Sequence, residues 1–342
     1  MTADEIRTLP YRHLIRMTTD RGMYEHARED APRAHHGYCT DDVARALTVV
    51  MREPEQSPEL DRLREIYLRF VEAAVTPGGR VSNRMSRTGR WMDEPSIGDW
   101  WGRAVAALGF AAVHAVAPTH RDRAMRSFLR VARQRSTDVR ASAFAALGAA
   151  EVLRADPASV EAKSLLEDCL AVIPLAPSVA WAWPEPRLRY ANATLCEALI
   201  VGGHLLGRSE LVDRGLELLS VLVEIETSPS GWLSPTGSAG RAPGERGPLW
   251  DQQAIEPAAL AEACVRACEV TGDVAWLEGA RLALGWFLGS NDIGIPMVDV
   301  ATGAGYDGLQ PKGRNTNRGA ESTLAALSTF QLVGALGLVA AS

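Results

Sequence analysis

The sequence lacks the features that mark several large classes of protein. It has 36 Lys and Arg against 42 Asp and Glu, a formal net charge of -6, and no basic stripe of the kind that nucleic-acid binding requires. No segment approaches the roughly 20 apolar residues of a membrane-spanning helix. The N-terminus has no basic stretch followed by an apolar run, as a secretory leader would. We therefore expect a cytoplasmic protein without a nucleic-acid or membrane partner.

Motifs for cofactors and for serine chemistry are also missing. The Gly-containing runs do not follow a strand, as a phosphate-binding turn must, and no Gly-x-Ser-x-Gly occurs. The five cysteines are odd in number and lie mostly in apolar helical patterns, as buried thiols do. Cys264 and Cys268 share a helix face but have no second pair at ligand spacing, and His35 and His36 lack a third ligand. We therefore predict no metal and no cofactor, which leaves carboxylate chemistry on a neutral polar substrate.

One pattern recurs six times: a polar loop that ends in Asp, Asn or Glu runs into a helix rich in small residues. A residue of these types there caps the helix or complements its positive N-terminal dipole. Hydrophobic residues make up 46% of the chain, which is enough for a large core. The six helix starts are at Thr40-Asp41-Asp42, Asp99, Asp138, Asn192, Trp250-Asp251 and Gly319-Ala320-Glu321.

Amphipathic segments lie between these small-residue helices and are typical of outer helices that cover an inner set. Alternation of inner and outer helices predicts an all-α fold, a single (α/α)6 toroid over residues 1–342. The first outer segment has no partner before it, so we expect it to pair with the last inner helix and close the ring. The outer segments are 3–17, 60–75, 121–133, 160–172, 210–225 and 274–288.

The connections differ in length, and this difference predicts where a site lies. Links from inner to outer helices are short, whereas the links 76–98, 173–189, 226–249 and 290–318 are long. Long loops in compact domains are usually functional. All four would lie at the end where the inner helices begin, so we expect one mouth that collects acids, loops and helix dipoles.

Aromatic residues favour the same mouth. Flat rings beside carboxylates suit sugars, which stack on aromatic faces and hydrogen-bond through their hydroxyls. For any single ring, packing of a loop onto the barrel is an equally good interpretation. The tryptophans in or just after the long links are Trp91, Trp100, Trp101, Trp181, Trp183, Trp232 and Trp250.

The best catalytic candidates are Asp251, Asp41 and Asp42. Glu256 follows Asp251 by five residues, about 140° around a helix, so both cannot face one substrate if the helix has begun. For Asp41 and Asp42 the alternative is a first-turn role with an ion pair to Arg45. We hypothesise that Asp251 and one of Asp41 and Asp42 face each other as the acid and base of an inverting hydrolysis.

The predicted substrate-binding residues are polar or aromatic and lie at the same mouth. Asp99, Asp307 and Glu321 could instead be ordinary turn or helix-start acids. The predicted binding residues are Tyr38, His36, Arg45, Asp99, Trp100, Trp183, Glu185, Trp250, Gln252, Gln253, Asp307, Asn317 and Glu321.

Taken together, these stretches resemble the all-helical domain that many bacterial glycosyltransferase proteins carry C-terminal to their transferase module, and that also occurs alone. The resemblance covers nearly the whole chain. It departs at Val43, where relatives have Asn, at Trp101, where they have His, and at Ala191 and Thr194, where they have Asp and Arg. The matching stretches are 37–42 with 44–47, Asn83, Met85, Arg90-Trp91, Asp99, 102–104, Trp183, Glu185, 251–253, Ile255-Glu256, 307–309, Asn317 and 319–325.

The resemblance implies a six-hairpin toroid similar to those of inverting glycosidases and sugar epimerases. The expected function is therefore glycosidase-like hydrolysis of an oligosaccharide or glycoconjugate. Two alternatives stay open. One is a non-catalytic glycan-binding partner of a separate glycosyltransferase, and the other is a sugar epimerase or phosphorylase.

Overall fold

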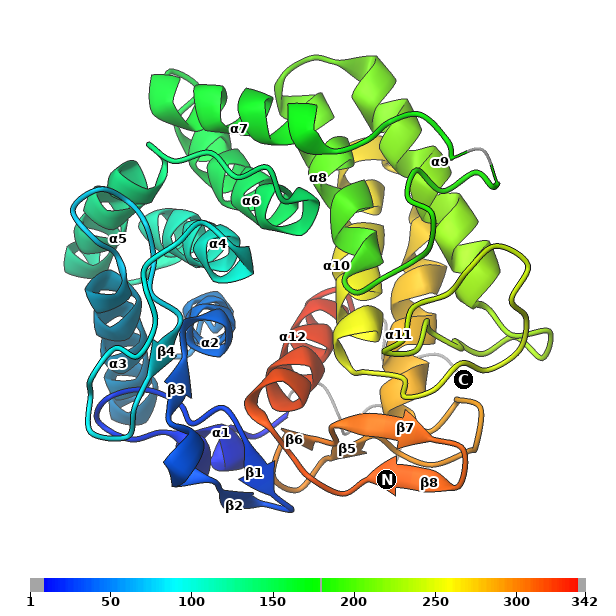
Figure 1. Ribbon diagram of the computed structural model, residues 1–342, viewed down its shortest axis with the longest axis horizontal. Helices are drawn as coiled ribbons and strands as arrows, with labels where there is room; N and C mark the ends of the chain where they lie inside the picture. Colours follow the sequence, from blue (N-terminus) through cyan, green and yellow to red (C-terminus); the bar gives the residue numbers. More distant parts are fainter. Residues whose placement is uncertain (1–8, 179, 338–342) are drawn as a thin grey trace.

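Six inner helices surround a central axis in the computed structural model, which describes residues 9–178 and 180–337 (Figure 1). Each inner helix packs against the next in chain order, and α12 packs against α2, so the ring is closed. The predicted all-α (α/α)6 toroid is confirmed. The inner helices are α2 (Thr40–Arg52), α4 (Asp99–His114), α6 (Val139–Ala155), α8 (Asn192–Leu205), α10 (Ile255–Thr271) and α12 (Ala320–Ala335).

The outer helices cover this ring, each packed on the inner helix that precedes it around the circle. The first outer helix, predicted over 3–17, is observed as α1 and begins only at Arg12. Residues 1–8 lie outside the described part of the chain. Helix α1 does pack on α12, and Gln331 donates a hydrogen bond to the Tyr11 hydroxyl at 2.8 Å. The outer helices are α1 (Arg12–Met17), α3 (Pro58–Ala74), α5 (Pro118–Val131), α7 (Val160–Val172), α9 (Ser209–Glu226) and α11 (Leu277–Leu288).

Glycine allows two of the inner helices to touch backbone to backbone. A Cβ atom on Gly102 of α4 would lie 2.3 Å from the carbonyl oxygen of Ala141 of α6, and one on Gly148 of α6 would lie 2.3 Å from that of Val105. No side chain fits at those distances. The small-residue composition of the inner helices therefore follows from how closely they pack around the axis.

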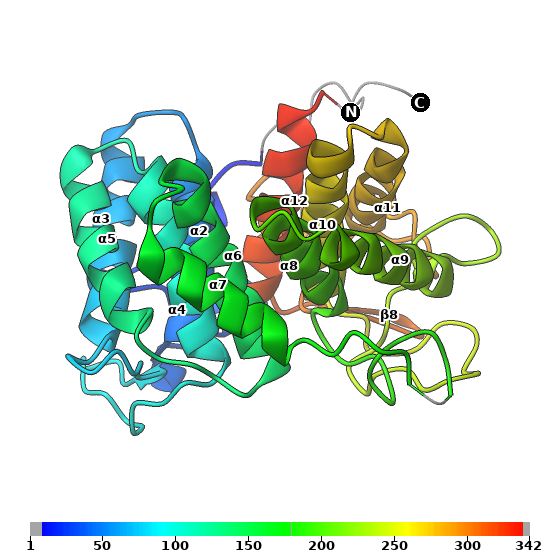
Figure 2. The same cartoon turned by 90° about the horizontal axis from the view of Figure 1, so that it is seen from above.

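The long links all lie at one end of the ring, the lower edge in Figure 2. They contain short antiparallel hairpins, and β3 pairs with β4, which joins the link before α2 to the link before α4. The strands are β1 (Ala27–Arg28), β2 (Ala31–Pro32), β3 (Tyr38–Cys39), β4 (Arg84–Met85), β5 (Val298–Asp299), β6 (Ala304–Gly305), β7 (Gly308–Gln310) and β8 (Gly313–Asn315). Two 3-10 turns, η2 (Ala34–His36) and η3 (Val274–Trp276), complete the described elements.

Within the described ranges, every helix is too short or too polar to cross a membrane.

Candidate active site

A cavity of about 690 Å³ opens at the loop end of the ring, and we call it the mouth cavity. Its walls are the first turns of the inner helices and the links that lead into them. Neutral polar and aromatic groups on its wall include Asn83, Trp100, Tyr190 and Gln253. Its acidic and basic residues are Glu25, His26, Asp41, Asp42, Arg84, Asp99, Asp138, Asp251, Asp307 and Glu321.

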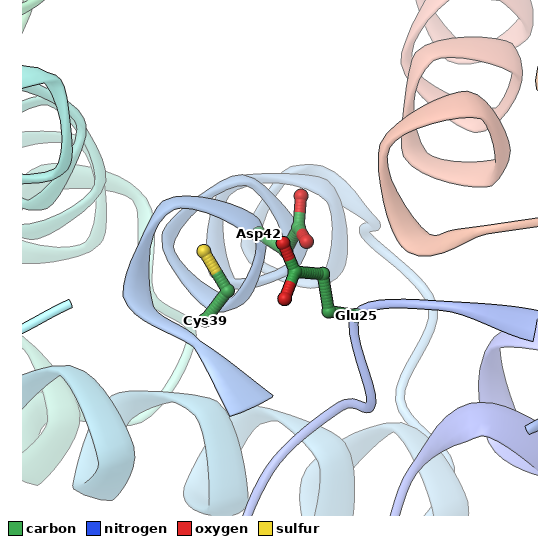
Figure 3. A group of neighbouring side chains, drawn as sticks. All are labelled: Glu25, Cys39 and Asp42. Carbon is green, nitrogen blue, oxygen red and sulfur yellow. The ribbon is translucent and has the colours of Figure 1, made fainter. Parts of the chain in front are cut away.

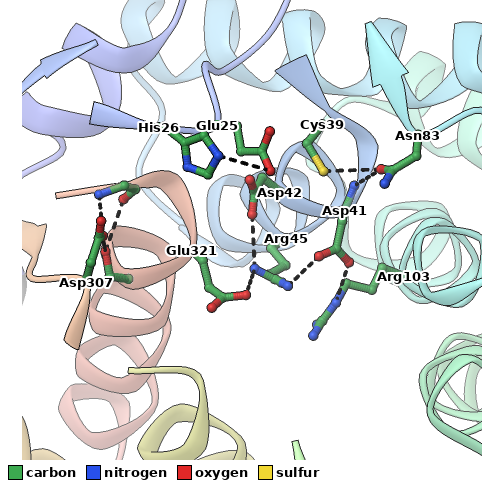
Figure 4. A network of polar contacts seen from close by, with 12 residues as sticks. Glu25, His26, Cys39, Asp41, Asp42, Arg45, Asn83, Arg103, Asp307 and Glu321 are labelled. Atoms are coloured by element: carbon green, nitrogen blue, oxygen red, sulfur yellow. Dashed lines mark hydrogen bonds and ion pairs between the residues drawn. The ribbon is translucent and has the colours of Figure 1, made fainter. Parts of the chain in front are cut away.

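Arg45 organises one side of this cavity. Its guanidinium contacts Asp41 at 2.6 Å, Asp42 at 3.0 Å and Glu321 at 2.9 Å, as Figure 4 shows. Arg103 of α4 reaches the other oxygen of Asp41 at 2.7 Å. Because Glu321 belongs to α12, this network ties three inner helices together at the floor of the mouth.

The two adjacent acids of α2 have opposite electrostatic environments. Burial raises the pKa of Asp42 well above its usual range, and the charges of Asp41 and Glu321 add to this effect against the opposing charge of Arg45. Burial alone would also raise the pKa of Asp41, but Arg45 and Arg103 hold that pKa below its usual range. These environments favour the protonated form of Asp42 and the ionised form of Asp41.

Asp251 lies three residues before Ala254, the N-cap of α10, and its carboxylate is available to a ligand. Its side chain has no hydrogen bond or ion pair with any residue that the structure describes. The backbone around it is nevertheless fixed, because Gln252 and Leu309 exchange backbone hydrogen bonds of 3.0 and 2.9 Å. The backbone at Asp251 is thus fixed by its neighbours, while its carboxylate lies on the wall of the mouth cavity without a partner among the described residues.

Three other acids of the mouth cavity have partners within the protein. The Tyr190 hydroxyl donates to Asp99, whose pKa is raised by burial and also by the charges of Asp138 and Asp41. Asp138 caps α6 by accepting two backbone N–H groups at 2.9 Å. Asp307 accepts from the backbone N–H of Gly319 at 2.6 Å and from the Ser322 hydroxyl at 2.7 Å, where it anchors the start of α12.

Several of the residues predicted to bind substrate are buried away from the mouth cavity. Tyr38 is 2% exposed and stacks on Tyr24, with ring centroids 4.9 Å apart. The Gln252 amide is fully buried, donates to Asp292 at 2.6 Å and accepts from Trp286 at 3.1 Å. These side chains brace loops and cannot contact a substrate in the mouth without rearrangement.

Trp183 and Glu185 likewise hold a loop in place and do not line the mouth cavity. The Trp183 indole is completely buried and donates to Glu185 at 3.4 Å. Glu185 in turn binds Arg140 of α6 at 2.5 Å. The link before α8 is therefore fastened to α6 through these three residues.

The remaining predicted residues lie beside the mouth cavity. His36 is exposed and packs edge-on against His26, with ring centroids 4.8 Å apart. The Asn317 side chain accepts the backbone N–H of Glu29 at 3.0 Å. Trp250 is half-buried, and Arg45 lies below the cavity floor.

Among the tryptophans of the long links, Trp100 lines the mouth cavity. The others do not; Trp232 donates to Asp292, for example, and Trp91 packs edge-on against Phe70. The interpretation that these rings pack loops onto the barrel therefore describes most of them.

The residues on the cavity wall that were not predicted as site residues include Glu25, Arg84 and Tyr190. Arg84 of β4 donates to Glu25, which precedes β1, so this ion pair joins two different links. Tyr190 was visible in the sequence as the residue before the departure at Ala191. For Glu25 no local signal exists, because its link carries no helical or motif pattern.

Glu25, Cys39 and Asp42 form the group of possible metal ligands in the described part of the chain (Figure 3). Their donor atoms lie within 4.8 Å of one another. However, Arg84 already binds Glu25, and the Cys39 thiol donates to the Asn83 side chain at 3.2 Å. Burial raises the pKa of this thiol well above its usual range. Since the three groups have protein partners, we assign no metal to them.

No protein-family model and no curated protein matches the sequence. Solved structures do match it over nearly its whole length. A sugar epimerase from a ruminal bacterium is 13% identical, with 98% of this chain and 99% of that chain covered and a TM-score of 0.73. A cellobiose 2-epimerase from Spirochaeta thermophila is 13% identical, with coverages of 92% and 90% and a TM-score of 0.64.

A cellulase of C. cellulolyticum is 9% identical, with coverages of 92% and 87% and a TM-score of 0.60. Identities this low show a common fold and leave the activity open. The resemblance to the helical domain of glycosyltransferase proteins stays a prediction. The chain has the (α/α)6 toroid fold that these sugar epimerases and cellulases share.

Proposed function

We propose that the protein is a carbohydrate-active enzyme that hydrolyses a glycosidic bond in an oligosaccharide or glycoconjugate. Asp42 is the proton donor and Asp251 the general base. The observation that carries the proposal is that one cavity holds two carboxyl groups in contrasting environments. Asp42 is 5% exposed with a raised pKa, whereas the Asp251 side chain lacks a partner among the described residues. Glycosidases use such a pair.

The reaction follows from these two roles. Asp42 gives its proton to the glycosidic oxygen as the bond from that oxygen to the anomeric carbon breaks. Asp251 accepts a proton from a water molecule, whose oxygen forms the new bond to the anomeric carbon. The net reaction is the addition of water across the glycosidic bond. Exchange of protons with solvent then returns Asp42 and Asp251 to their starting protonation states. Arg45, 3.0 Å from Asp42, stabilises the carboxylate that the donor becomes.

The neighbouring residues position the groups that react. Asp41 holds Arg45 and Arg103 in place and is thereby neutralised, so we assign it a positioning role. Trp100 and Tyr190 offer ring surface on the cavity wall, and Gln253 offers an amide to sugar hydroxyls.

A sugar epimerase is the second candidate. The observation that favours it is the likeness to a sugar epimerase over 98% of this chain and 99% of that one, with no large insertion needed in either. Epimerisation at a carbon beside a carbonyl removes and returns a proton on carbon, whereas hydrolysis does not. The two activities can therefore be separated by isotope incorporation.

The decisive experiment incubates the purified protein with glucose- and mannose-containing oligosaccharides in D₂O, with and without inorganic phosphate. Hydrolysis predicts new reducing ends, no dependence on phosphate and no deuterium on carbon. Deuterium at the carbon beside the carbonyl would instead show an epimerase. Turnover only with phosphate would show a phosphorylase, and binding without turnover would show a glycan-binding protein.

The assignment of the base is tested with Asp251→Asn, which preserves shape but cannot accept the proton. It should bind substrate and lose about 10²–10⁴-fold in turnover. Asp213→Asn, an exposed acid on the outer helix α9, is the matched control and should keep wild-type turnover. Full activity in Asp251→Asn on a confirmed substrate would contradict the assignment.

A further inference from the structure

A second cavity, of about 190 Å³, lies along the axis between the six inner helices, and we call it the axial chamber. Its wall on α2 runs from Ala44 to Arg52, eight steps along the helix, which at 1.5 Å per residue is a length of about 12 Å. It begins where the mouth cavity ends, because Glu321 lines both spaces. The chamber is thus the continuation of the mouth toward the centre of the ring.

The wall of the axial chamber is mainly apolar, and its uncharged polar residues are Thr48, Thr194 and Ser328. Charged side chains lie only toward its two ends, and most are paired: Arg45 with Glu321 at 2.9 Å, and Arg52 with Glu262 at 2.8 Å. A sugar ring would leave most of its hydroxyls without partners on such walls, at a large cost in desolvation. The apolar wall residues include Val49, Phe110, Phe144, Leu147, Val201, Ile255 and Leu324.

The volume of the chamber suits one small ring. An engineered apolar cavity of about 150 Å³ in another protein is known to bind benzene. The chamber is somewhat larger, and its mouth-side end offers a flat stacking surface, where the Arg103 guanidinium lies 3.8 Å from the centroid of the Phe144 ring. An unfilled apolar cavity of this size forgoes packing contacts that an occupant would restore.

The residue that lines both spaces is Glu321. Its side chain is 39% exposed, and its ion pair in the described structure is with Arg45 alone. Arg45 keeps two further partners, Asp41 and Asp42, so Glu321 can turn aside without leaving the arginine unpaired. Entry of a group attached to a ligand in the mouth would therefore displace this one exposed carboxylate.

We infer that the axial chamber binds an apolar group of about the size of benzene, and that this group is the aglycone of a glycoside whose sugar occupies the mouth cavity. The second half of the inference rests on the proposed function. The substrate class is then an aryl or similarly compact apolar glycoside.

The test uses the full chain, with benzene and matched pairs of phenyl and methyl glycosides of glucose and mannose as probes, and needs no turnover. Benzene should bind, as measured by ligand-observed NMR. The phenyl glycoside should bind at least about tenfold more tightly than its methyl counterpart, as expected for burial of one ring. Ala259→Leu on α10 and Ala325→Leu on α12 each add bulk to the chamber wall and should abolish both effects. Ala73→Leu, on the exposed face of α3, should abolish neither.

The outcomes separate this inference from the proposed function. Absence of benzene binding, or binding that survives both filling variants with their circular dichroism unchanged, would overturn the chamber as a binding site. Benzene binding without a preference for phenyl over methyl glycosides would overturn the aglycone assignment and leave hydrolysis of other glycosides untouched. Failure of the proposed function, seen as deuterium on carbon or as no hydrolysis in the D₂O assay, would leave the benzene result standing.

Discussion

The two ends of the axial chamber use charge in different ways. At the mouth, acids outnumber basic groups: eight carboxyl groups line that cavity with Arg84 and His26, and Arg45 and Arg103 lie beneath. At the other end the charges are matched in ion pairs. We call that second group the far-end cluster; it consists of Arg52, His114, Glu151, Glu197, Glu262 and Arg266.

The far-end cluster links inner helices to one another through ion pairs. Arg52 of α2 binds Glu262 of α10 at 2.8 Å, and Arg266 of α10 binds Glu151 of α6 at 2.6 Å. Neither pair joins neighbouring helices of the ring, so both cross the axis. They separate the axial chamber from a cavity of about 480 Å³ on the opposite face, because Arg52, Glu151 and Arg266 line both spaces.

An ionisable residue that faces the axis is therefore not by itself evidence of catalysis. Where each charge has a partner on another helix, its role is to hold the helices together. Where carboxyl groups are in excess, at least one of them, Asp251, is left available to a substrate. Variants at four acidic residues test this distinction, with Glu269→Gln as a control.

The largest effect is expected at the mouth, from Asp42→Asn. Because burial favours the protonated form of Asp42, the neutral amide resembles that form of the side chain and the variant should fold. It cannot donate a proton, so turnover should fall by about 10²–10⁴-fold, or about 2.7–5.4 kcal/mol in barrier height. Wild-type turnover should also decline as pH rises through the folded-state pKa of Asp42, since the donor then loses its proton. Rates on a confirmed substrate across a pH series check both; an unchanged rate in the variant would remove Asp42 from the mechanism.

The next effect is expected in the far-end cluster, from Glu151→Gln. Burial would raise the pKa of Glu151, but the hydrogen bond with His114 and the charge of Arg266 lower it to about 2. Its stabilisation is therefore present above the unfolded-state pKa and is lost as pH falls toward about 2. Removing this buried partner should cost about 3–5 kcal/mol at neutral pH by urea denaturation.

Glu269→Gln is the matched control for that variant. Glu269 binds the same Arg266 at 2.8 Å, but its side chain is 50% exposed. An exposed pair of this kind contributes about 0–1 kcal/mol. Equal losses in the two variants would show that burial does not distinguish the far-end cluster from surface pairs.

A smaller effect of opposite sign is expected from Glu197→Gln. Burial and the charge of Glu262 raise the pKa of Glu197 to about 8. The folded protein thus holds this proton more tightly than the unfolded chain, and the stability that it contributes is lost as pH rises from the unfolded-state pKa to about 8. The variant should match wild type near the unfolded-state pKa and exceed it at alkaline pH by at least about 1.4 kcal/mol, one pKa unit. Urea denaturation at a series of pH values measures this difference. A difference in unfolding free energy between the two proteins that does not change with pH would contradict the prediction.

The smallest effect is expected from Asp138→Asn, an acid on the mouth wall that serves as a helix cap. Asparagine caps as well as aspartate, so unfolding free energy should change by less than about 0.5 kcal/mol, whereas Asp138→Ala should lose about 0.5–2 kcal/mol. Turnover of Asp138→Asn should stay near wild type. If Asp138→Asn lost most of its turnover at unchanged stability, Asp138 would have a catalytic role and not only a capping role.

The helices and their order could be predicted from the sequence. Asp99 and Asn192 begin α4 and α8, Asp138 caps α6, and the long links lie together at one end, as expected. These features are local: apolar periodicity and first-turn acids act within a few residues along the chain. The ion pairs of Arg45 with Asp41 and Asp42 could be predicted for the same reason, because the three residues share one helical turn.

The availability of each side chain was decided only by the tertiary structure. Gln252 stands next to Asp251, yet its amide is buried against Asp292 and Trp286 while the neighbouring carboxylate has no partner among the described residues. Glu25 and Glu321 reach the same cavity from opposite ends of the chain. Hydrogen bonds and ion pairs form over a few ångströms in space, whatever the separation in sequence. Residue types and helical periods therefore determine which elements form, and the packing of distant links determines which acids remain for a substrate.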